Sequence, residues 1–404
     1  MRAGRTSSIG RACACAVDCW SVASRPLACL LLALLCAAAR PAAQTLPRGT
    51  IVDAVTCAED PAQSYALYLP SDYTPDRPWS LLLAFHPGAR GRAIVEVYQV
   101  AAERYGYIVA GSNNSRNGPW KASAEAVRAL SRDVAQRFVI DAERVYATGH
   151  SGGARLAMAL AQSNDSIAGV IASSAGFAEP TPRTSVRFPV FATAGTDDFN
   201  YVEMRRLDAT LRSPHHLAVF DGGHALPPPA VAREAIEWLE LQAMRSGRRG
   251  KDGPLIQALY TSRNAQVEAA ADPVTTRRLL TSLTEDFAGL RDIAVDRGRL
   301  AALDRDPSVR KAVARDRADL DSEARALDEA LRLEGRLGDV DQRLANLARL
   351  ETILADWARS AASDAASPAR SRARRLLSAL AAGAAGRTND ETYRALVQKY
   401  RWRS

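Results

Sequence analysis

One serine in this chain stands in a setting that suits a nucleophile. Residues 149–153 read Gly-His-Ser-Gly-Gly, and Ser151 at their centre follows the apolar, β-type run 145–148. The stretch 154–161 after it is rich in Ala and Leu, which is typical of a helix that packs closely on a sheet. A G-x-S-x-G turn between a buried strand and a helix exposes the serine oxygen, and its glycines permit strained backbone angles. We therefore predict that Ser151 is a nucleophile.

A serine hydroxyl attacks well only when a base removes its proton and a carboxylate orients that base. The chain has five histidines; two precede Ser151, and two others, His215 and His216, open a predicted strand at 217–220. His224 follows that strand in the loop Asp-Gly-Gly-His, at the sheet edge where catalytic groups gather in parallel α/β folds. We predict His224 as the base, and an ordinary surface histidine is the alternative.

The carboxylate should follow the preceding strand. Asp197 and Asp198 come directly after the apolar stretch 191–196, and both are candidates. Asp208 falls in a predicted helix and Asp165 in a loop before a strand, so both are worse placed. One member of the adjacent pair has an alternative role as the cap of the helix that begins near Tyr201.

The elements around these residues alternate between strand and helix patterns across residues 45–244. Strands are predicted at 64–69, 80–85, 107–110, 167–171, 189–192 and 217–220. Helices are predicted at 123–138 with Ser123 as N-cap, after Ser151, and at about 230–244. This is the pattern of a mostly parallel sheet covered by helices. Only a short proline-containing link, 178–182, separates two strands where a cap domain would be inserted. We expect no cap domain and an open site that suits bulky or polymer-attached substrates.

Three motifs together carry a family resemblance: Gly-His-Ser-Gly-Gly at 149–153, Gly-Thr-Asp-Asp at 195–198 and Gly-Gly-His at 222–224. They resemble the secreted bacterial α/β-hydrolases of the feruloyl esterase and polyhydroxybutyrate depolymerase type, over residues 50–244. The resemblance implies an α/β-hydrolase fold and hydrolysis of carboxylic esters through a Ser-His-Asp triad and an acyl-enzyme. It also favours Asp198 over Asp197, because the acid of this family is the last residue of a G-T-x-D segment.

The oxyanion formed during such a reaction needs backbone N–H donors. One should be Gly152, directly after the nucleophile. The resemblance places the second in the loop after Phe85, where the family commonly has His-Gly. This chain has His86-Pro87 instead, and proline has no N–H. The second donor is therefore expected at Gly88 or Ala89.

Trp120 follows a predicted strand at the catalytic edge, so it is a candidate for lining the substrate pocket. A tryptophan buried in the core is the alternative. His86 and His150 are the other candidate pocket residues.

Residues 245–404 have a different composition. A basic, glycine-containing linker is expected at 245–254, and 255–404 are dominated by Ala, Leu, Arg and Asp. Apolar residues recur at helical spacing, which predicts two or more antiparallel helices; the positions are Leu320, Ala324, Leu327, Leu331, Leu337, Val340, Leu344, Leu347, Leu350, Leu354 and Trp357. From Arg245 onward the chain has 30 Lys and Arg against 23 Asp and Glu. With no His or Cys there, we assign no chemistry to 255–404. One hypothesis is that this region binds the cell envelope or a partner protein. The other is that its basic surplus only forms a solvated helix face.

The N-terminal residues 1–44 read as a secretory signal. Basic residues precede the apolar core 27–36, and small residues follow it. We expect a periplasmic or extracellular protein; a lipid anchor at Cys36 is less favoured. Five of the six cysteines lie in the first forty positions, which leaves Cys57 as a structural thiol. We expect no metal, no cofactor, no transmembrane segment and no nucleic-acid partner.

The sequence therefore predicts a serine esterase with Ser151, His224 and Asp198 as its triad. A serine peptidase of the prolyl-oligopeptidase-like type on the same fold is one alternative. A non-catalytic envelope-binding or scaffold protein is the other.

Overall fold

The computed structural model describes residues 46–179, 184–363, 366–387 and 390–402. The predicted leader, residues 1–44, lies outside the described residues. Pro47–Ser404 forms one compact unit.

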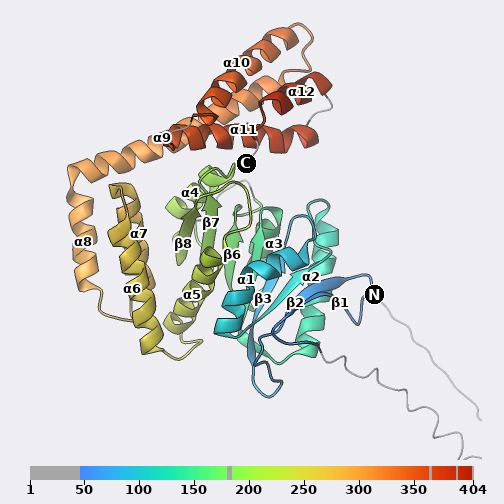
Figure 1. The fold of residues 1–404 in the computed structure, drawn as a ribbon, viewed down its shortest axis with the longest axis vertical. Coiled ribbons are helices and arrows are strands. Elements are labelled where there is room, and N and C mark those ends of the chain that lie inside the picture. Colours follow the sequence, from blue (N-terminus) through green and yellow to red (C-terminus); the bar gives the residue numbers. More distant parts are fainter. Residues whose placement is uncertain (1–45, 180–183, 364–365, 388–389, 403–404) are drawn as a thin grey trace, which may run out of the picture. The chain divides into compact units, whose positions relative to one another are not determined.

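A sheet with helices packed around it forms the α/β part of this unit (Figure 1). The sheet has eight strands in the order β1-β2-β4-β3-β5-β6-β7-β8. Its strands are β1 (Ile51–Thr56), β2 (Ser64–Tyr68), β3 (Trp79–Phe85), β4 (Tyr107–Ser112), β5 (Ile140–His150), β6 (Ile167–Ser173), β7 (Val190–Gly195) and β8 (His215–Phe220). β2 is antiparallel to both β1 and β4, and the strands from β4 to β8 pair in parallel. This strand order, with a turn to a helix after β5, is that of the α/β-hydrolase fold.

The central strands form because their sequences are apolar throughout. Every residue of β3 and of β6 is buried, as expected for parallel strands covered on both faces. Five helices belong to the α/β part: α1 (Gly91–Tyr105), α2 (Trp120–Arg137), α3 (Gly152–Ser163), α4 (Tyr201–Thr210) and α5 (Pro229–Arg245). Tyr98 of α1 and Trp238 of α5 belong to the same apolar core beside the sheet. Because β3 to β8 run in parallel, their carboxyl ends lie at one edge of the sheet.

The start of α2 differs from the prediction. The helix begins at Trp120, directly after Pro119, so Ser123 is not its N-cap. The Ser123 hydroxyl instead donates a hydrogen bond to the carbonyl of Arg116 at 2.9 Å and fixes the loop before the helix. Between β6 and β7, the described residues 174–179 and 184–189 contain no helix.

Three further helices complete the core beside α5: α6 (Gly253–Ala269), α7 (Pro273–Asp286) and α8 (Ala294–Arg305). Leu241 and Met244 of α5 are buried together with Leu259 of α6 and Leu280 of α7. The carboxylate of Asp286 accepts a hydrogen bond from Trp238 Nε1 at 2.6 Å. The predicted linker, 245–254, covers the end of α5 and the start of α6, and its Arg249 pairs with Glu240. Helices α6 and α7 are thus packed against the hydrolase part.

The last four helices have an apolar core of their own. They are α9 (Pro307–Gly335), α10 (Arg343–Ala361), α11 (Pro368–Arg387) and α12 (Glu391–Tyr400). Leu350, Leu377 and Tyr393 are among the residues buried in it. Val340 and Leu344 were predicted in this seam but are 86% and 80% exposed. Val340 lies in the turns that separate α9 from α10, so the helical spacing does not continue through it, and Leu344 lies in the first turn of α10 on its exposed face.

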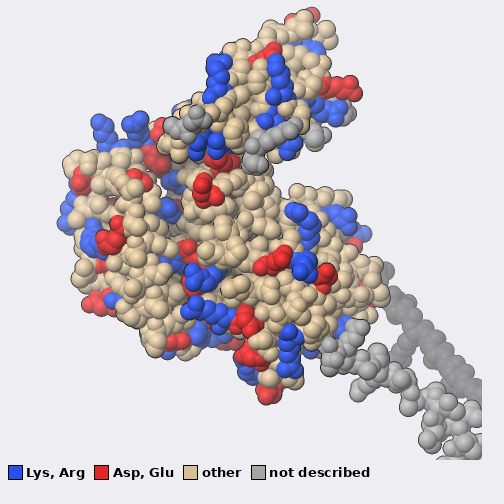
Figure 2. Space-filling view, in the orientation of Figure 1, with Lys and Arg blue, Asp and Glu red and all other residues tan. Residues whose placement is uncertain are grey.

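Basic and acidic side chains are interspersed over the face shown in Figure 2, including the part formed by the C-terminal helices. The basic surplus of residues 245–404 therefore forms no continuous patch on that face.

Candidate active site

Ser151 occupies a strained turn between β5 and α3. Its backbone angles are φ 53° and ψ −122°, a conformation that residues with a side chain rarely adopt. The neighbouring glycines make this turn possible. A Cβ at Gly149 would lie 2.1 Å from the carbonyl oxygen of Gly153, and a Cβ at Gly153 would lie 2.1 Å from that of Phe85. Only glycine fits at either position, so this sequence motif folds as the predicted strand–turn–helix.

A carboxylate–imidazole pair lies at the same sheet edge. Asp198, in the loop between β7 and α4, has no exposed surface, and its Oδ1 lies 2.8 Å from Nδ1 of His224 in the loop after β8. The same oxygen accepts the backbone N–H of Asn200 at 2.8 Å. The ring of Phe199 stacks on His224 with 3.9 Å between the ring centroids. The His224 ring is thus held by Asp198 at one nitrogen and by Phe199 on one face.

Asp197 has a different partner from its neighbour. Its Oδ2 accepts a hydrogen bond from Nη1 of Arg374 in α11 at 2.9 Å. Its backbone N–H donates to the carbonyl of Gly222 at 2.8 Å, which ties the loop of the acid to the loop of His224. Of the two adjacent aspartates, the structure brings Asp198 to the histidine and turns Asp197 toward the C-terminal helices.

His150 connects the serine turn with this pair. It precedes Ser151, and its ring centroid lies 4.8 Å from that of His224. No hydrogen bond joins Ser151 Oγ to His224 among the described residues. In free enzymes this bond often forms only when substrate is present.

The backbone N–H groups predicted as oxyanion donors differ in whether they already have an acceptor. Gly152 is the first residue of α3, so its N–H has no acceptor within the helix. The N–H of Gly88 instead points to His86 Nδ1 at 3.0 Å, and the N–H of Ala89 donates to the carbonyl of His86 at 3.1 Å. The loop closes on itself in this way because Ala89 adopts a positive φ of 55°. The N–H of Ala89 is therefore engaged inside its own loop, and that of Gly88 is engaged when His86 accepts at Nδ1.

Two donors compete for the ring of His86. Arg90 Nη2 lies 2.9 Å from His86 Nε2, while the N–H of Gly88 faces Nδ1. A neutral imidazole accepts at one nitrogen only, so only one of these contacts is a hydrogen bond at a time. Burial, with the charge of Arg90, lowers the pKa of His86 to about 4. The ring is therefore neutral at neutral pH.

Asn117 is a site residue that the sequence did not single out. A Cβ at Gly152 would lie 1.8 Å from Asn117 Oδ1, so the amide sits directly against the residue after Ser151. The backbone N–H of Asn117 donates to the carbonyl of Pro87 at 2.8 Å, which joins the loops after β3 and β4. Among the described residues the side-chain amide has no hydrogen-bond partner. The only signal in the sequence was its position after a strand at the catalytic edge.

A pocket of about 250 Å³ opens beside Gly152. The residues that line it include His86, Asn117, Trp120, Gly152 and Leu156. Trp120 is 52% exposed, so it forms a wall of this pocket and does not fill the core. His150 is buried and is not among the lining residues. Burial and the neighbouring His224 lower the pKa of His150 to about 3, which keeps it neutral.

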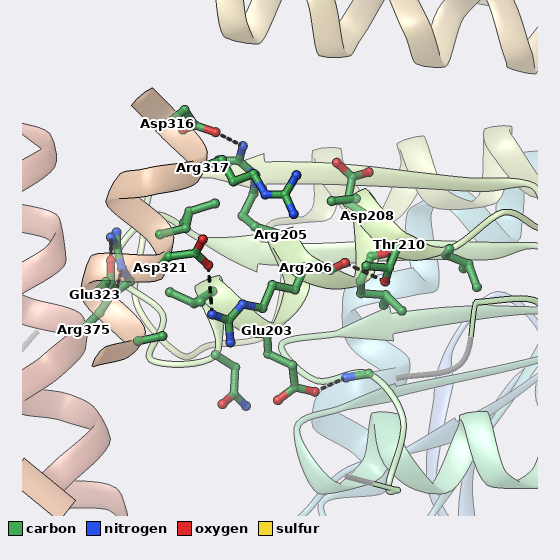
Figure 3. A pocket seen from close by; sticks show the side chains of 18 of the residues that line it. Glu203, Arg205, Arg206, Asp208, Thr210, Asp316, Arg317, Asp321, Glu323 and Arg375 are labelled. Carbon is green, nitrogen blue, oxygen red and sulfur yellow. Dashed lines mark hydrogen bonds and ion pairs between the residues drawn. The ribbon is translucent and has the colours of Figure 1, made fainter. Parts of the chain in front are cut away.

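A larger cavity, of about 1270 Å³, lies between α4 and the helices α7, α9 and α11 (Figure 3). It extends to Phe199, which stacks on His224. Its charged groups are largely paired with one another: Arg205 with Asp316 at 2.7 Å, Arg206 with Asp321 at 3.2 Å and Arg375 with Glu323 at 2.5 Å. The first two pairs join α4 of the α/β part to α9, and the third joins α11 to α9.

Cys57 is the one cysteine among the described residues. Cys57 is buried, and its pKa is raised to about 11 by burial and by Asp133, so the thiol is unreactive. Within the described ranges, no cluster of three or more His, Cys, Asp or Glu side chains is arranged to hold a metal. No helix in this part of the chain is long and apolar enough to cross a membrane.

Similar solved structures share part of this fold. A thermostable esterase is 21% identical, with 46% of this chain and 61% of that chain covered and a TM-score of 0.37. A feruloyl esterase module from Clostridium thermocellum is 14% identical, with 46% and 85% covered and a TM-score of 0.35. An S-formylglutathione hydrolase from Agrobacterium tumefaciens is 16% identical, with 45% of this chain and 90% of that chain covered and a TM-score of 0.35. The fold is the α/β-hydrolase fold. That assignment rests on strand order and on the turn at Ser151.

No protein-family model matches the chain. No curated protein matches it either. This chain spans 61% of the length of the thermostable esterase.

Proposed function

We propose that this protein is a serine hydrolase that cleaves carboxylic esters. The observation that carries the proposal is the contact of 2.8 Å between Asp198 and His224, at the same sheet edge as the strained turn of Ser151. A nucleophile, a base and a group that orients the base are what acyl transfer by serine requires.

In the proposed reaction, His224 Nε2 takes the proton of Ser151 as its Oγ attacks the acyl carbon. Asp198 accepts the Nδ1–H of His224 and stabilises the imidazolium that forms. The Gly152 N–H donates to the oxyanion. Collapse of the tetrahedral intermediate expels the alcohol, which takes its proton from His224. Water, activated by the same histidine, then attacks the acyl-enzyme and releases the acid.

The second oxyanion donor is assigned to Asn117 in this proposal. Its side-chain amide lies against Gly152 with Oδ1 nearest, lines the pocket there, and would donate through Nδ2. The N–H of Ala89 is engaged with the carbonyl of His86, and that of Gly88 is engaged whenever His86 accepts at Nδ1. Side-chain amides serve this role in other acyl-transfer enzymes.

The pocket favours a substrate that enters only in part. A volume of about 250 Å³ lies just below the usual range for small-molecule sites and suits a single ring or a short chain. Trp120 at its wall is half exposed, and the described residues between β6 and β7 form no covering helix. A bulky or polymer-attached alcohol would then remain outside the pocket. We also propose export, on the composition of residues 1–44.

Replacement of the nucleophile tests this function. Ser151→Ala should abolish turnover of p-nitrophenyl acetate, and His224→Gln should do nearly the same damage. Asp165→Asn is a matched control, because Asp165 pairs with Arg187 at the protein surface. Turnover that survives Ser151→Ala would refute the assignment. If peptide substrates are cleaved faster than all esters of a panel, the protein is a peptidase and the proposed esterase activity is wrong.

A further inference from the structure

The C-terminal helix α11 reaches the loop that carries the candidate triad acid. Arg374 Nη1 donates to Asp197 Oδ2 at 2.9 Å, and Arg375 Nη1 donates to the carbonyl of Thr196 at 2.6 Å. Asp197 lies beside Asp198 and is also bonded through its N–H to the loop of His224. Two consecutive arginines therefore hold two consecutive residues of the acid loop.

We propose that Arg374 is a positioning residue for the candidate triad: it neutralises Asp197 and holds the loop of Asp198 against the loop of His224. The inference rests on the function proposed above. It gives the C-terminal helices a direct part in the hydrolytic site.

The arginine is itself held firmly. Its Nε donates to the carbonyl of Ala361 at 3.3 Å, and its guanidinium lies 4.2 Å from the ring centroid of Trp402. The neighbouring Arg375 forms a two-pronged pair with Glu323 of α9, at 2.7 and 2.5 Å. The side chains of Arg374 and Asp197 are only 18% and 14% exposed. A pair this sheltered is screened little by solvent, so its charges act strongly on neighbouring groups.

The charge of Asp197 matters because of its place in the chain. A second carboxylate beside Asp198 would stabilise the imidazolium of His224 and so retain the proton that the base must lose before it can act. Arg374 cancels that charge. Without Arg374, the charge of Asp197 would act on the site uncompensated, and the acidic limb of the activity profile should lie at higher pH. Without Asp197, the unpaired guanidinium would have the opposite effect.

The other charged groups around the pair do not obscure this effect. His150 and His86 face the site from β5 and from the loop after β3, and their lowered pKa values keep them neutral above pH 5. Arg90 lies beside His86, and Asp221 accepts a hydrogen bond from Thr196. On the side of the C-terminal helices, Glu323 is paired with Arg375. Each of these groups is unchanged by substitutions at 374 and 197.

The test is the pH dependence of kcat/KM for p-nitrophenyl acetate, measured on the full chain. Arg374→Ala should move the acidic limb up by about one pH unit, which is roughly a tenfold loss on that limb. Asp197→Asn should move it down. The double variant should return to the wild-type limb. Arg206→Ala is the matched control: it breaks another pair between the α/β part and α9, with Asp321, and should leave the limb in place.

Opposite shifts that cancel in the double variant would support the proposal, since general loosening of the fold does not change sign. Equal limbs in all variants, or shifts in one direction, would overturn it. If Arg374→Ala does not fold, Asp197→Asn still decides: a limb that moves down supports the proposal, and one that stays or moves up overturns it. Activity surviving in Ser151→Ala would instead refute the proposed function, whatever the limbs do.

Discussion

At the scale of single residues, two neighbouring aspartates have different partners. Asp198 is fully buried on His224, whereas Asp197 pairs with Arg374. Asp198→Asn should lower kcat by about 10³–10⁴-fold, because an amide no longer fixes the histidine tautomer. Asp197→Asn should cost less than about tenfold at the pH optimum, since it removes a charge and no contact to His224. Steady-state kinetics decides, and near-equal losses would contradict the assignment of Asp198.

Asn117 is the side chain next to Gly152. Asn117→Ala should lower kcat by about 10²–10³-fold with little change in KM, because an oxyanion donor acts in the transition state. Trp120→Ala, at the exposed wall of the same pocket, should mainly raise KM. An unchanged kcat in Asn117→Ala would return the second donor to the backbone.

The buried histidines make stability depend on pH. Burial lowers the pKa of His150 to about 3 and that of His86 to about 4. Below the unfolded pKa of about 6.5, the unfolded chain binds protons that the native site does not, so the free energy of unfolding decreases as pH falls. Each histidine contributes a slope of about 1 kcal/mol per pH unit there. Urea unfolding should show that the free energy of unfolding falls less between pH 7 and pH 5 for His150→Gln than for wild type. An equal fall would contradict the assignment of this pH dependence to His150.

At the scale of elements, the strand–turn–helix around Ser151 depends on close backbone contacts. Gly149→Ala places a Cβ 2.1 Å from the backbone of Gly153. It should lower stability by about 1–3 kcal/mol and also reduce activity. Gly298→Ala is the control: this helical position of α8 has open space around it, and alanine should raise stability by up to about 1 kcal/mol. Thermal unfolding midpoints distinguish the two, and a Gly149→Ala protein as stable as wild type would show that the turn does not need glycine there.

Most elements of the sheet could be predicted because they are apolar throughout. Continuous apolar runs marked β3 and β6, and the glycines at 149–153 marked the turn. β1 was missed because it is largely exposed and carries no continuous run. The start of α2 was misplaced because Ser123 fixes the preceding loop. A hydrogen bond from one side chain to a neighbouring loop leaves no periodic pattern in the sequence.

At the scale of the whole molecule, the C-terminal region is not one uniform appendage. Helices α6 and α7 bury Leu241 and Met244 of α5 and supply the acceptor for Trp238, whereas α9–α12 have a separate apolar core. A chain that ends at residue 306 should therefore remain soluble and folded. A chain that ends at residue 251 should aggregate, because it exposes the core face of α5.

Size-exclusion chromatography and circular dichroism of the two truncated chains test this, with the full chain as reference. A folded, monodisperse chain ending at residue 251 would show that residues 45–244 form an independent domain, as the sequence predicts. Helices α6 and α7 would then not be needed to cover α5.

Long-range contacts set the limit of what the sequence reveals. Arg374 and Asp197 are 177 positions apart, and one arginine among the 53 Lys and Arg of the chain carries no mark of its partner. The triad candidates were accessible because strand order and loop position restrict them. Asn117 and Phe199 became visible only when neighbouring loops were brought together.

Whether Ser151 is an activated nucleophile is tested most directly by covalent labelling of the full chain with a fluorophosphonate probe, followed by peptide mass spectrometry. Such probes modify a serine only when its hydroxyl is activated by a base. We predict labelling on Ser151, lost in Ser151→Ala and strongly slowed in His224→Gln. A chain whose Ser151 stays unlabelled under conditions that label a known esterase would contradict the proposed serine hydrolase.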